Sequence, residues 1–444
     1  MTTALPPEPD ETSAEVASGS GASTTPRRTT SRRGFLRGAA VTGAGVAAVV
    51  GGGTGYGIAR ATESTAAASS TADTVPFYGA NQAGIATDAQ DRVAFATFDV
   101  AAGVDRVSLE QMLGQWAAAS ARMTTGAAVG PTETQPDNPP VDTGEALGLS
   151  PANLTVTVGF GASLFDDRFG LAHKRPAALA AIPAFRGDAL DAAKSGGDLC
   201  VQACSNDPVV AFHVIRNLAR IGRGTVTMRW SQLGFGRTST TSRSQSTPRN
   251  LMGFKDGTNN IKAEDKAEMN EFVWVGDDTD QKWMVGGTYL VSRRIRMLIE
   301  SWDTDYIADQ EKVFGRTKES GAPLTGHAEF DTPNLAAKTS TGALTINKAA
   351  HIRLASPDNH GGAKLLRRGY SYTDGQDPLT GQLDAGLFFI CFNRDPRTQF
   401  VPVQRALSQN DLLNEYIKHT SSGLFAVPPG LSAVGDWFGK SLFT

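Results

Sequence analysis

The sequence predicts an α+β fold made of antiparallel sheets. Short apolar segments of strand length recur along the chain, and helical patterns interrupt them at a few places. In the first half the order is strand, helix, strand, strand, helix, strand, which is the split βαβ order of a ferredoxin-like unit. With 444 residues, 40% of them hydrophobic and 20% charged, the chain has room for about two to three domains.

The first unit is predicted over residues 76–240. Its strands are expected at 93–99, 154–161, 199–203 and 225–230, and its helices at 108–123 and 208–221. Residues 154–161 show the alternation that a strand with two different faces requires. Ser108 is a candidate N-cap, because its side chain can accept a hydrogen bond from the first turn of the helix. A loop rich in Pro and Thr is expected over 130–143.

A second unit of similar type is suggested over residues 241–444. Its strands are expected at 270–275, 287–297, 351–355 and 386–392, and its helices at 302–314 and 408–419. The chain shows no close internal sequence repeat, so the residues alone do not establish that the two units share an architecture.

Residues 1–68 are predicted to be a leader outside the fold. The first 30 residues are rich in Pro, Ser, Thr, Glu and Ala without apolar periodicity, which is typical of disorder. The pair Arg32 and Arg33 precedes an uncharged, glycine-rich stretch and resembles a twin-arginine export signal. A transmembrane anchor is the alternative, but the stretch has few large apolar residues. We therefore expect the twin-arginine translocase to export the folded chain, which makes it a secreted or extracytoplasmic protein.

Charge and cysteine content exclude two classes of protein. The net charge is −3, so the chain has no basic excess for binding nucleic acid. Its three cysteines cannot build a disulfide framework. We expect all three to be buried thiols: Cys200, Cys204 and Cys391.

Three segments combine residue types that suit catalysis. In the first, over 253–260, Asp256 lies between glycines, which allow a turn to bring one short carboxylate close to a ligand. The second begins with His351, and the third contains the pair Arg367 and Arg368. An Asp-Gly turn alone is commonly a solvated turn, so the signal lies in the combination of carboxylate, imidazole and guanidinium.

In order, spacing and flanking residues, these three segments resemble the dye-decolourising (DyP-type) haem peroxidases. The similarity is to the exported branch that includes the deferrochelatase/peroxidases, and it runs from about Phe77 to about Phe438. The resemblance implies two ferredoxin-like halves, with haem b between the sheet and the helices of the C-terminal half. Because the chain has no Cys-x-x-Cys-His segment, the haem is expected to be non-covalent.

The resemblance also implies roles for residues on the proximal side of the haem. His351 becomes the iron ligand, with His327 as its rival, and Arg353 becomes a partner for a haem propionate. Asp395 is the expected hydrogen-bond acceptor for the second nitrogen of the ligand. Three residues are expected to border the haem edge with their backbone: Gly257, Thr258 and Asn259.

On the distal side, the resemblance implies that Asp256 moves a proton between the oxygens of hydrogen peroxide and that Arg367 stabilises the developing charge. Arg368 competes for the second role. The implied function is that of a secreted peroxidase, which oxidises an organic or dye-like donor through a ferryl intermediate. The alternatives are a deferrochelatase, which removes iron from haem, and a non-catalytic haem carrier. The sequence does not identify the donor or the oligomeric state.

Overall fold

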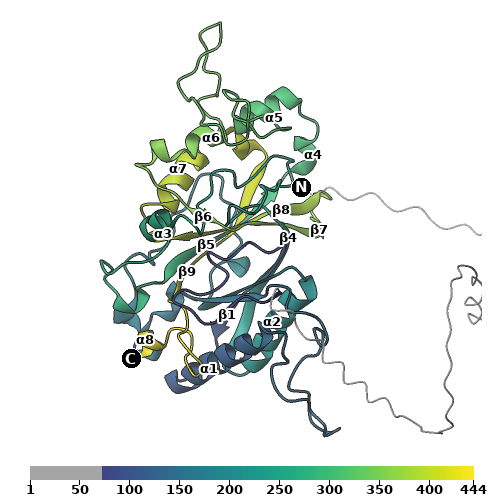
Figure 1. Ribbon diagram of the computed structural model, residues 1–444, viewed down its shortest axis with the longest axis vertical. Coiled ribbons are helices and arrows are strands. Elements are labelled where there is room, and N and C mark those ends of the chain that lie inside the picture. The colour runs from purple at the N-terminus through teal and green to yellow at the C-terminus, as the bar shows by residue number, and fades with distance from the viewer. Residues whose placement is uncertain (1–72) are drawn as a thin grey trace, which may run out of the picture. The chain divides into compact units, whose positions relative to one another are not determined.

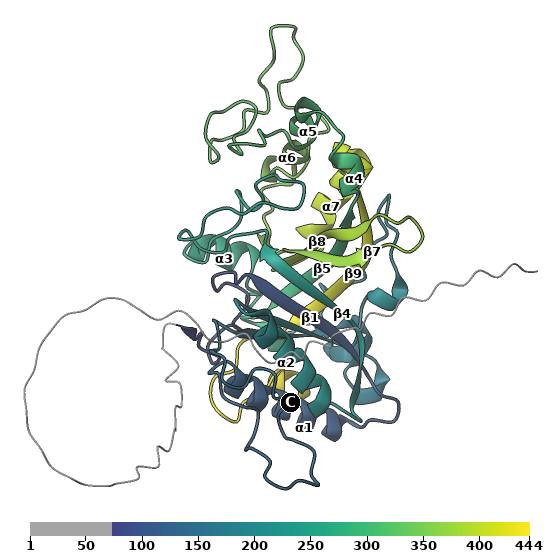
Figure 2. The ribbon, with the colours of Figure 1, turned by 90° about the vertical axis from the view of Figure 1, so that its right-hand side faces the viewer.

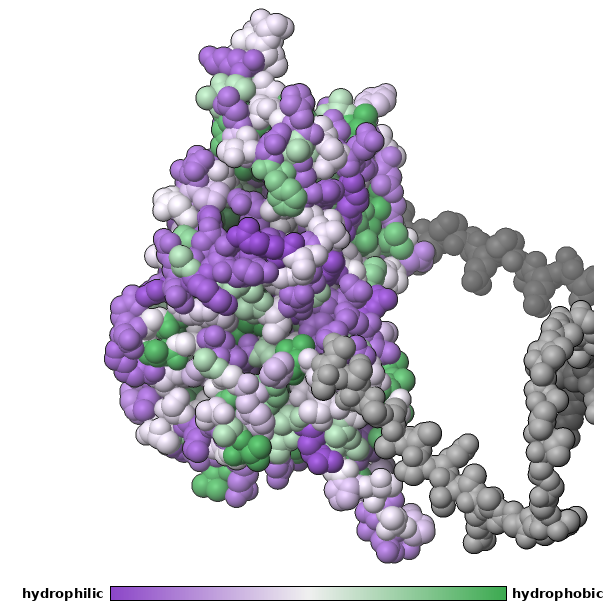
Figure 3. Space-filling model, in the orientation of Figure 1, coloured by the Kyte–Doolittle hydropathy of each residue, from purple (hydrophilic) through white to green (hydrophobic). Residues whose placement is uncertain are grey.

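The computed structural model describes residues 73–444, which lie within one compact unit (Figure 1). The predicted leader, with its arginine pair, lies outside the described residues. In the described part of the chain, no helix is long and apolar enough to cross a membrane. On the face drawn in Figure 3, hydrophobic residues form small separate patches among polar ones.

The N-terminal half is a ferredoxin-like unit with all its strands antiparallel. Its elements are β1 (Arg92–Val100), α1 (Arg106–Met123), β2 (Thr155–Gly161), β3 (Leu199–Ser205), α2 (Pro208–Ile221) and β4 (Val226–Arg237). The strands lie in the order β2-β3-β1-β4. This is the arrangement that the order of elements in the sequence predicts.

The C-terminal half repeats this arrangement with longer connections. Its elements are α3 (Lys266–Phe272), β5 (Thr288–Met297), α4 (Ile299–Trp302), α5 (Ile307–Phe314), α6 (His351–Leu354), β6 (Leu366–Arg367), β7 (Tyr370–Gln376), β8 (Leu383–Asn393), α7 (Phe400–Asn410), β9 (Ile417–Val427) and α8 (Lys440–Phe443). Four strands lie in the antiparallel order β9-β5-β8-β7, and the short β6 pairs with β8.

The two halves share one sheet. Strand β2 pairs with β9 and β4 pairs with β7, so that eight strands form a closed circuit of hydrogen bonds. Helices α1 and α2 lie outside this closed sheet against the N-terminal strands, while α4 to α7 lie outside it at the opposite end, against the C-terminal strands (Figures 1 and 2). The circuit leaves only β6 as an added strand, and β6 carries Arg367.

Strand β1 separates two hydrophobic cores, because successive side chains point to opposite faces of a strand. Ala94, Ala96 and Phe98 face the core beneath α1 and α2. Val93 and Phe95 face the second core, which combines residues of both halves. In that core the Phe95 ring lies 5.2 Å from the ring of Phe388, on β8 of the other half.

Several predicted boundaries were wrong. The N-cap of α1 is Asp105, whose carboxylate accepts from the backbone N–H of Ser108 at 2.7 Å, and the predicted cap Ser108 lies inside the first turn. The strand expected at 270–275 is instead the last three residues of helix α3 and the turn after it, where the N–H of the C-cap Val273 donates to the carbonyl of Met269 at 3.0 Å.

Two further predictions in the C-terminal half were wrong. Residues 351–355 form one helical turn, in which the N–H of Ala355 donates to the carbonyl of His351 at 2.9 Å. The helix expected at 408–419 is displaced: α7 ends at Asn410, and strand β9 begins at Ile417. Between them, Asp411 starts a short 3-10 turn. The five residues 351–355 are compatible with a short strand as well as with a single helical turn, so their pattern alone could not separate the two.

Candidate active site

Asp256 is placed by a tight turn that requires glycine at the next position. Gly257 has φ +95°, and a Cβ there would lie 2.8 Å from the Cα of Ser239. The N–H of Asp256 donates to the carbonyl of Pro248 at 2.9 Å. The Asp256 side chain is 17% exposed. The turn therefore holds a carboxylate at the edge of solvent, as the glycines in the sequence predict.

Arg367 is held by a side chain that the sequence analysis missed. Asn260 accepts from the N–H of Arg367 at 2.8 Å and donates to its carbonyl at 2.8 Å. The amide of Asn260 also donates to the carbonyl of Thr240 at 2.9 Å. Asn260 therefore ties the Asp256 turn to strand β6. The only sequence signal for Asn260 is its position directly after 257–259, the residues predicted to border the cofactor.

The two predicted distal residues contact each other. Nη1 of Arg367 lies 2.9 Å from Oδ1 of Asp256, and the Arg367 side chain is 26% exposed. Arg368 points elsewhere: it is fully buried and donates to the backbone carbonyls of Thr87 and Asp88. The choice of Arg367 over its neighbour therefore agrees with the geometry, because consecutive residues of an extended backbone point to opposite sides.

His351 begins α6 and is hydrogen-bonded to an acid from a distant segment. Its Nδ1 lies 2.6 Å from Oδ2 of Asp411, whose side chain is 2% exposed, while the imidazole is 35% exposed. The other oxygen of Asp411 accepts from the N–H of Leu413 at 2.9 Å. The N–H of Leu412 donates to the carbonyl of Ala349 at 3.1 Å, which fixes the two segments side by side.

The charges of the site act on His351. Burial lowers the pKa of its imidazole, but the carboxylate of Asp411 more than offsets this, so that the net pKa is raised. Asp256 also raises the pKa and Arg367 lowers it. The three residues selected from the sequence therefore lie within electrostatic range of one another, although they are far apart along the chain.

Asp395 is not the acceptor for His351, and that prediction was wrong. Its carboxylate accepts from the Arg397 side chain at 2.7 Å and from the Arg397 backbone N–H at 2.9 Å. It begins the turn after β8 and binds its own neighbours. The acceptor is Asp411. Residue 411 falls inside the helix that the sequence predicts over 408–419, where an acid is expected to face solvent.

The other predicted cofactor-binding residues have mixed environments. Arg353 donates through Nε to Asn347 and through Nη2 to Leu335 and Ile346, all at backbone carbonyls, so that only Nη1 remains for a propionate. Gly257 is buried and Asn259 is exposed. The hydroxyl of Thr258 donates to Glu329 at 3.0 Å.

Two cations near Arg367 were also missed. Burial lowers the pKa of Lys262, and the charge of Arg367 lowers it further. Burial likewise lowers the pKa of Arg316, where Glu329 opposes the shift and Arg367 adds to it. Lys262 is a lone basic residue in a loop, and its sequence context does not separate it from a surface charge.

Three of the other histidines differ from His351 in their exposure or in their partners. His327, the rival for the ligand role, is exposed. His213 is buried among the side chains of Asn217, Asp142 and Glu145. His419 is buried on β9.

The residues at this site fit a haem. With Nδ1 of His351 bonded to a carboxylate, the lone pair lies on Nε2, which has no hydrogen-bond partner among residues 73–444. Peroxidase haem iron takes one such neutral imidazole. The cations around Arg367 suit the two carboxylates that haem b carries.

Comparison with known proteins agrees with this geometry. The family model "Dyp-type peroxidase, N-terminal" matches residues 82–236, and "Dyp-type peroxidase, C-terminal" matches residues 247–432. The deferrochelatase of Escherichia coli (strain K12) is 38% identical over 372 residues, which cover 83% of this chain and 86% of that protein.

Solved structures show the same similarity. DtpA from Streptomyces lividans, in an oxyferrous/water mixed complex, is 40% identical with a TM-score of 0.77, covering 84% of this chain and 98% of that one. A DyP-type peroxidase from Cellulomonas bogoriensis is 39% identical with a TM-score of 0.74, covering 83% and 98%. The chain therefore belongs to the DyP-type peroxidase family of haem-dependent oxidoreductases.

Proposed function

We propose that this protein is a haem b peroxidase that reduces hydrogen peroxide with electrons from an organic or dye-like donor. The observation that supports it most is the ion pair of Asp256 and Arg367 at 2.9 Å, in electrostatic range of an imidazole whose Nε2 has no hydrogen-bond partner in the described part of the chain. All three cysteines are buried, so covalent attachment of the haem through thiols is not expected. His351 would hold the haem iron, and the positive charges of Lys262 and Arg316 near Arg367 would attract the haem carboxylates.

Each site residue has a separate task. Bound haem supplies an iron centre for peroxide and stores the oxidising equivalents until a donor reduces it. Asp256, with its carboxylate at the edge of solvent, takes a proton from one peroxide oxygen and returns it to the other. Arg367 orients this carboxylate through Nη1 and stabilises the negative charge that develops when the O–O bond breaks.

Asp411 accepts a hydrogen bond from the Nδ1–H of His351, which leaves the lone pair on Nε2, the nitrogen that would bind the iron. A carboxylate acceptor makes the imidazole a stronger electron donor, which stabilises oxidised iron. Peroxidase chemistry requires that oxidised iron is stabilised in this way. A haem carrier needs neither this acceptor nor an acid beside an arginine.

The proposal is tested by removing each distal group without removing the haem. Asp256→Asn and Arg367→Gln are expected to retain haem, since neither residue binds iron. At least one of them should slow the reaction with peroxide by roughly a hundredfold or more, which is the size of an acid/base or electrostatic contribution. Stopped-flow absorption measures the rate.

Asp395→Asn is the control, because Asp395 only caps its own turn. His351→Ala should lose most of the bound haem, whereas His327→Ala should not. If Asp256→Asn and Arg367→Gln both react at the parent rate, the distal assignment fails and the carrier function gains support.

A deferrochelatase activity is the second candidate, because a relative with 38% identity carries that name. It would remove iron and leave the porphyrin intact. The two activities are separated by incubating the holoprotein without peroxide and measuring free porphyrin by fluorescence. Accumulating porphyrin would favour the lyase.

We also propose export by the twin-arginine route, because Arg32 and Arg33 precede an otherwise weak signal. Replacing both with lysine should keep the protein in the cytoplasm, as cell fractionation would show. Unchanged export of this variant would contradict the proposal.

A further inference from the structure

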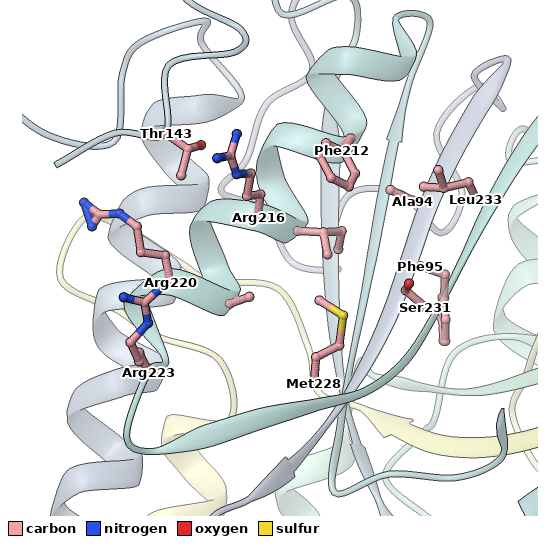
Figure 4. A pocket seen from close by; sticks show the side chains of 12 residues that line it. Ala94, Phe95, Thr143, Phe212, Arg216, Arg220, Arg223, Met228, Ser231 and Leu233 are labelled. Atoms are coloured by element: carbon pink, nitrogen blue, oxygen red, sulfur yellow. The ribbon is translucent and has the colours of Figure 1, made fainter. Parts of the chain in front are cut away.

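A cavity of about 470 Å³ lies in the N-terminal half, between helix α2 and strands β1 and β4 (Figure 4). Its lining includes none of Asp256, His351 or Arg367. The volume is in the range of sites that hold small organic molecules, roughly 300–1,000 Å³. The cavity is therefore a candidate for binding that is separate from the haem site.

One wall of this cavity exposes large apolar side chains. Phe212 on α2 is 44% exposed, and Met228 and Leu233 on β4 are 39% and 54% exposed. Single exposed apolar residues are common on protein surfaces. Three that line one concave site together form an apolar surface, which a ligand can cover at a gain of about 25 cal/mol per Å² buried.

Arginines line the other part of the cavity: Arg216, Arg220 and Arg223. Of the three, Arg216 alone has an acidic partner within residues 73–444, Glu145 at 3.3 Å. Arg220 donates to the backbone carbonyls of Pro140 and Val141, which satisfy hydrogen bonds but do not neutralise its charge. Arg223 is exposed, and its guanidinium has no partner among residues 73–444. The cavity therefore has an excess of positive charge.

The two kinds of residue are segregated. In Figure 4 the guanidinium groups of Arg216, Arg220 and Arg223 lie along one side of α2, while Phe212 and Met228 lie on the side toward the strands. We propose that this cavity binds a small amphiphilic organic anion. Its apolar ring or chain packs against Phe212, Met228 and Leu233, and its carboxylate or sulfonate meets Arg223, whose planar donors match such groups.

The site does not depend on haem chemistry, so it is tested without peroxide. The probe is naphthalene-2-sulfonate, titrated into the holoprotein by isothermal titration calorimetry, with naphthalene-2-sulfonamide as an uncharged analogue of similar shape. The sulfonate is expected to bind one per chain, and the sulfonamide roughly tenfold more weakly, because it lacks charge-assisted hydrogen bonds. Binding should weaken as salt is added.

Two variants locate the binding. Arg223→Gln should weaken the sulfonate roughly tenfold and leave the sulfonamide unchanged. Phe212→Ser should weaken both ligands, because it removes apolar contact. Arg186→Gln is the matched control: this arginine is exposed, has no side-chain partner among the described residues and lies outside the cavity. It should bind both ligands as the parent does.

Three results would overturn the proposal. The sulfonate could bind Arg223→Gln and Arg186→Gln equally well, which would place it elsewhere. The sulfonamide could bind as tightly as the sulfonate, which would remove the role of the arginines. Sedimentation could show a parent dimer that Phe212→Ser splits, which would make the cavity an interface between two copies. None of these results bears on reaction with peroxide, so the proposed peroxidase function stands or falls separately.

Discussion

The carboxylate of Asp411 determines which nitrogen of His351 can bind a metal. It lies 2.6 Å from Nδ1 and is almost fully buried, so water competes little for the bond. A buried anion that pairs with the ligand imidazole is a strong influence on both orientation and basicity. The residue that controls the ligand is therefore 60 positions away from it along the chain.

Asp411→Asn is expected to weaken haem binding by about 10- to 100-fold, the usual effect of removing such a partner. Asn retains an oxygen for the N–H of Leu413 but loses the negative charge. Transfer of haem from the holoprotein to apomyoglobin measures the change. Asp395→Asn is the matched control and should release haem at the parent rate. Equal haem release from both variants would show that Asp411 does not support the ligand.

The residues proposed to carry the chemistry could be predicted from the sequence, whereas the residues that hold them in place could not. His351, Asp256 and Arg367 stand in segments with distinctive flanks. Asp411 and Asn260 act through contacts with residues 60 and 107 positions away, and no local pattern records such contacts. Asp395 was selected because it follows a strand, yet its neighbour Arg397 satisfies its carboxylate.

At the scale of elements, the connection between α5 and α6 fixes where His351 lies. Gly315 ends α5 with φ +78°, and a Cβ there would lie 2.4 Å from Cγ2 of Ile352, the residue after the ligand. The Phe314 ring lies 6.1 Å from the imidazole. Helix α5 thus packs against α6 at a position that only glycine allows.

Gly315→Ala is expected to destabilise the protein and to weaken haem binding, because α6 must move to admit the methyl group. The backbone strain alone costs about 1–2 kcal/mol. Gly342→Ala is the control: its φ is +85°, but no atom lies within 4 Å of the added Cβ, so only the strain remains. Urea unfolding and haem titration measure the two effects. If both variants bind haem as the parent does, the contact with Ile352 is not important for the ligand.

Strand β9 carries a histidine that must stay neutral. Burial, followed by the charge of Arg293, lowers the pKa of His419 to about 3. In the unfolded chain this pKa is about 6.5. Between these values the unfolded state binds the extra proton, so stability falls as the pH drops below about 6.5.

His419→Gln is expected to reduce the loss of folding stability at low pH. The parent should lose up to about 1.4 kcal/mol more than the variant for each pH unit below about 6, because one pKa unit corresponds to that energy. Urea unfolding at several pH values measures the difference. His327→Gln, which changes an exposed histidine, should follow the parent curve. Parallel curves for the parent and His419→Gln would show that His419 is already charged in the folded protein.

The elements of the N-terminal half were predictable, because each strand and helix there is long enough for its period to show. Helix α2 has the bounds that were predicted. In the C-terminal half, α6 has four residues and β6 has two, and elements this short are fixed by packing rather than by local pattern.

At the scale of the whole molecule, the closed circuit of strands could not be read from the sequence. It depends on pairings such as β2 with β9 and β4 with β7, which join strands of different halves. Either half alone has the pattern of an independent ferredoxin-like unit. The circuit instead makes the two halves parts of one hydrogen-bonded structure with a shared core.

The two halves are therefore expected to unfold together. Phe95 of the first half and Phe388 of the second pack in one core, so loss of either half exposes apolar surface of the other. Phe95→Ala should cost about 3–5 kcal/mol and lower the melting temperature of the whole protein. Differential scanning calorimetry of the haem-free protein should show one transition for the parent and one, at lower temperature, for the variant. Two transitions, of which Phe95→Ala shifts only one, would mean that the halves fold independently despite the shared sheet.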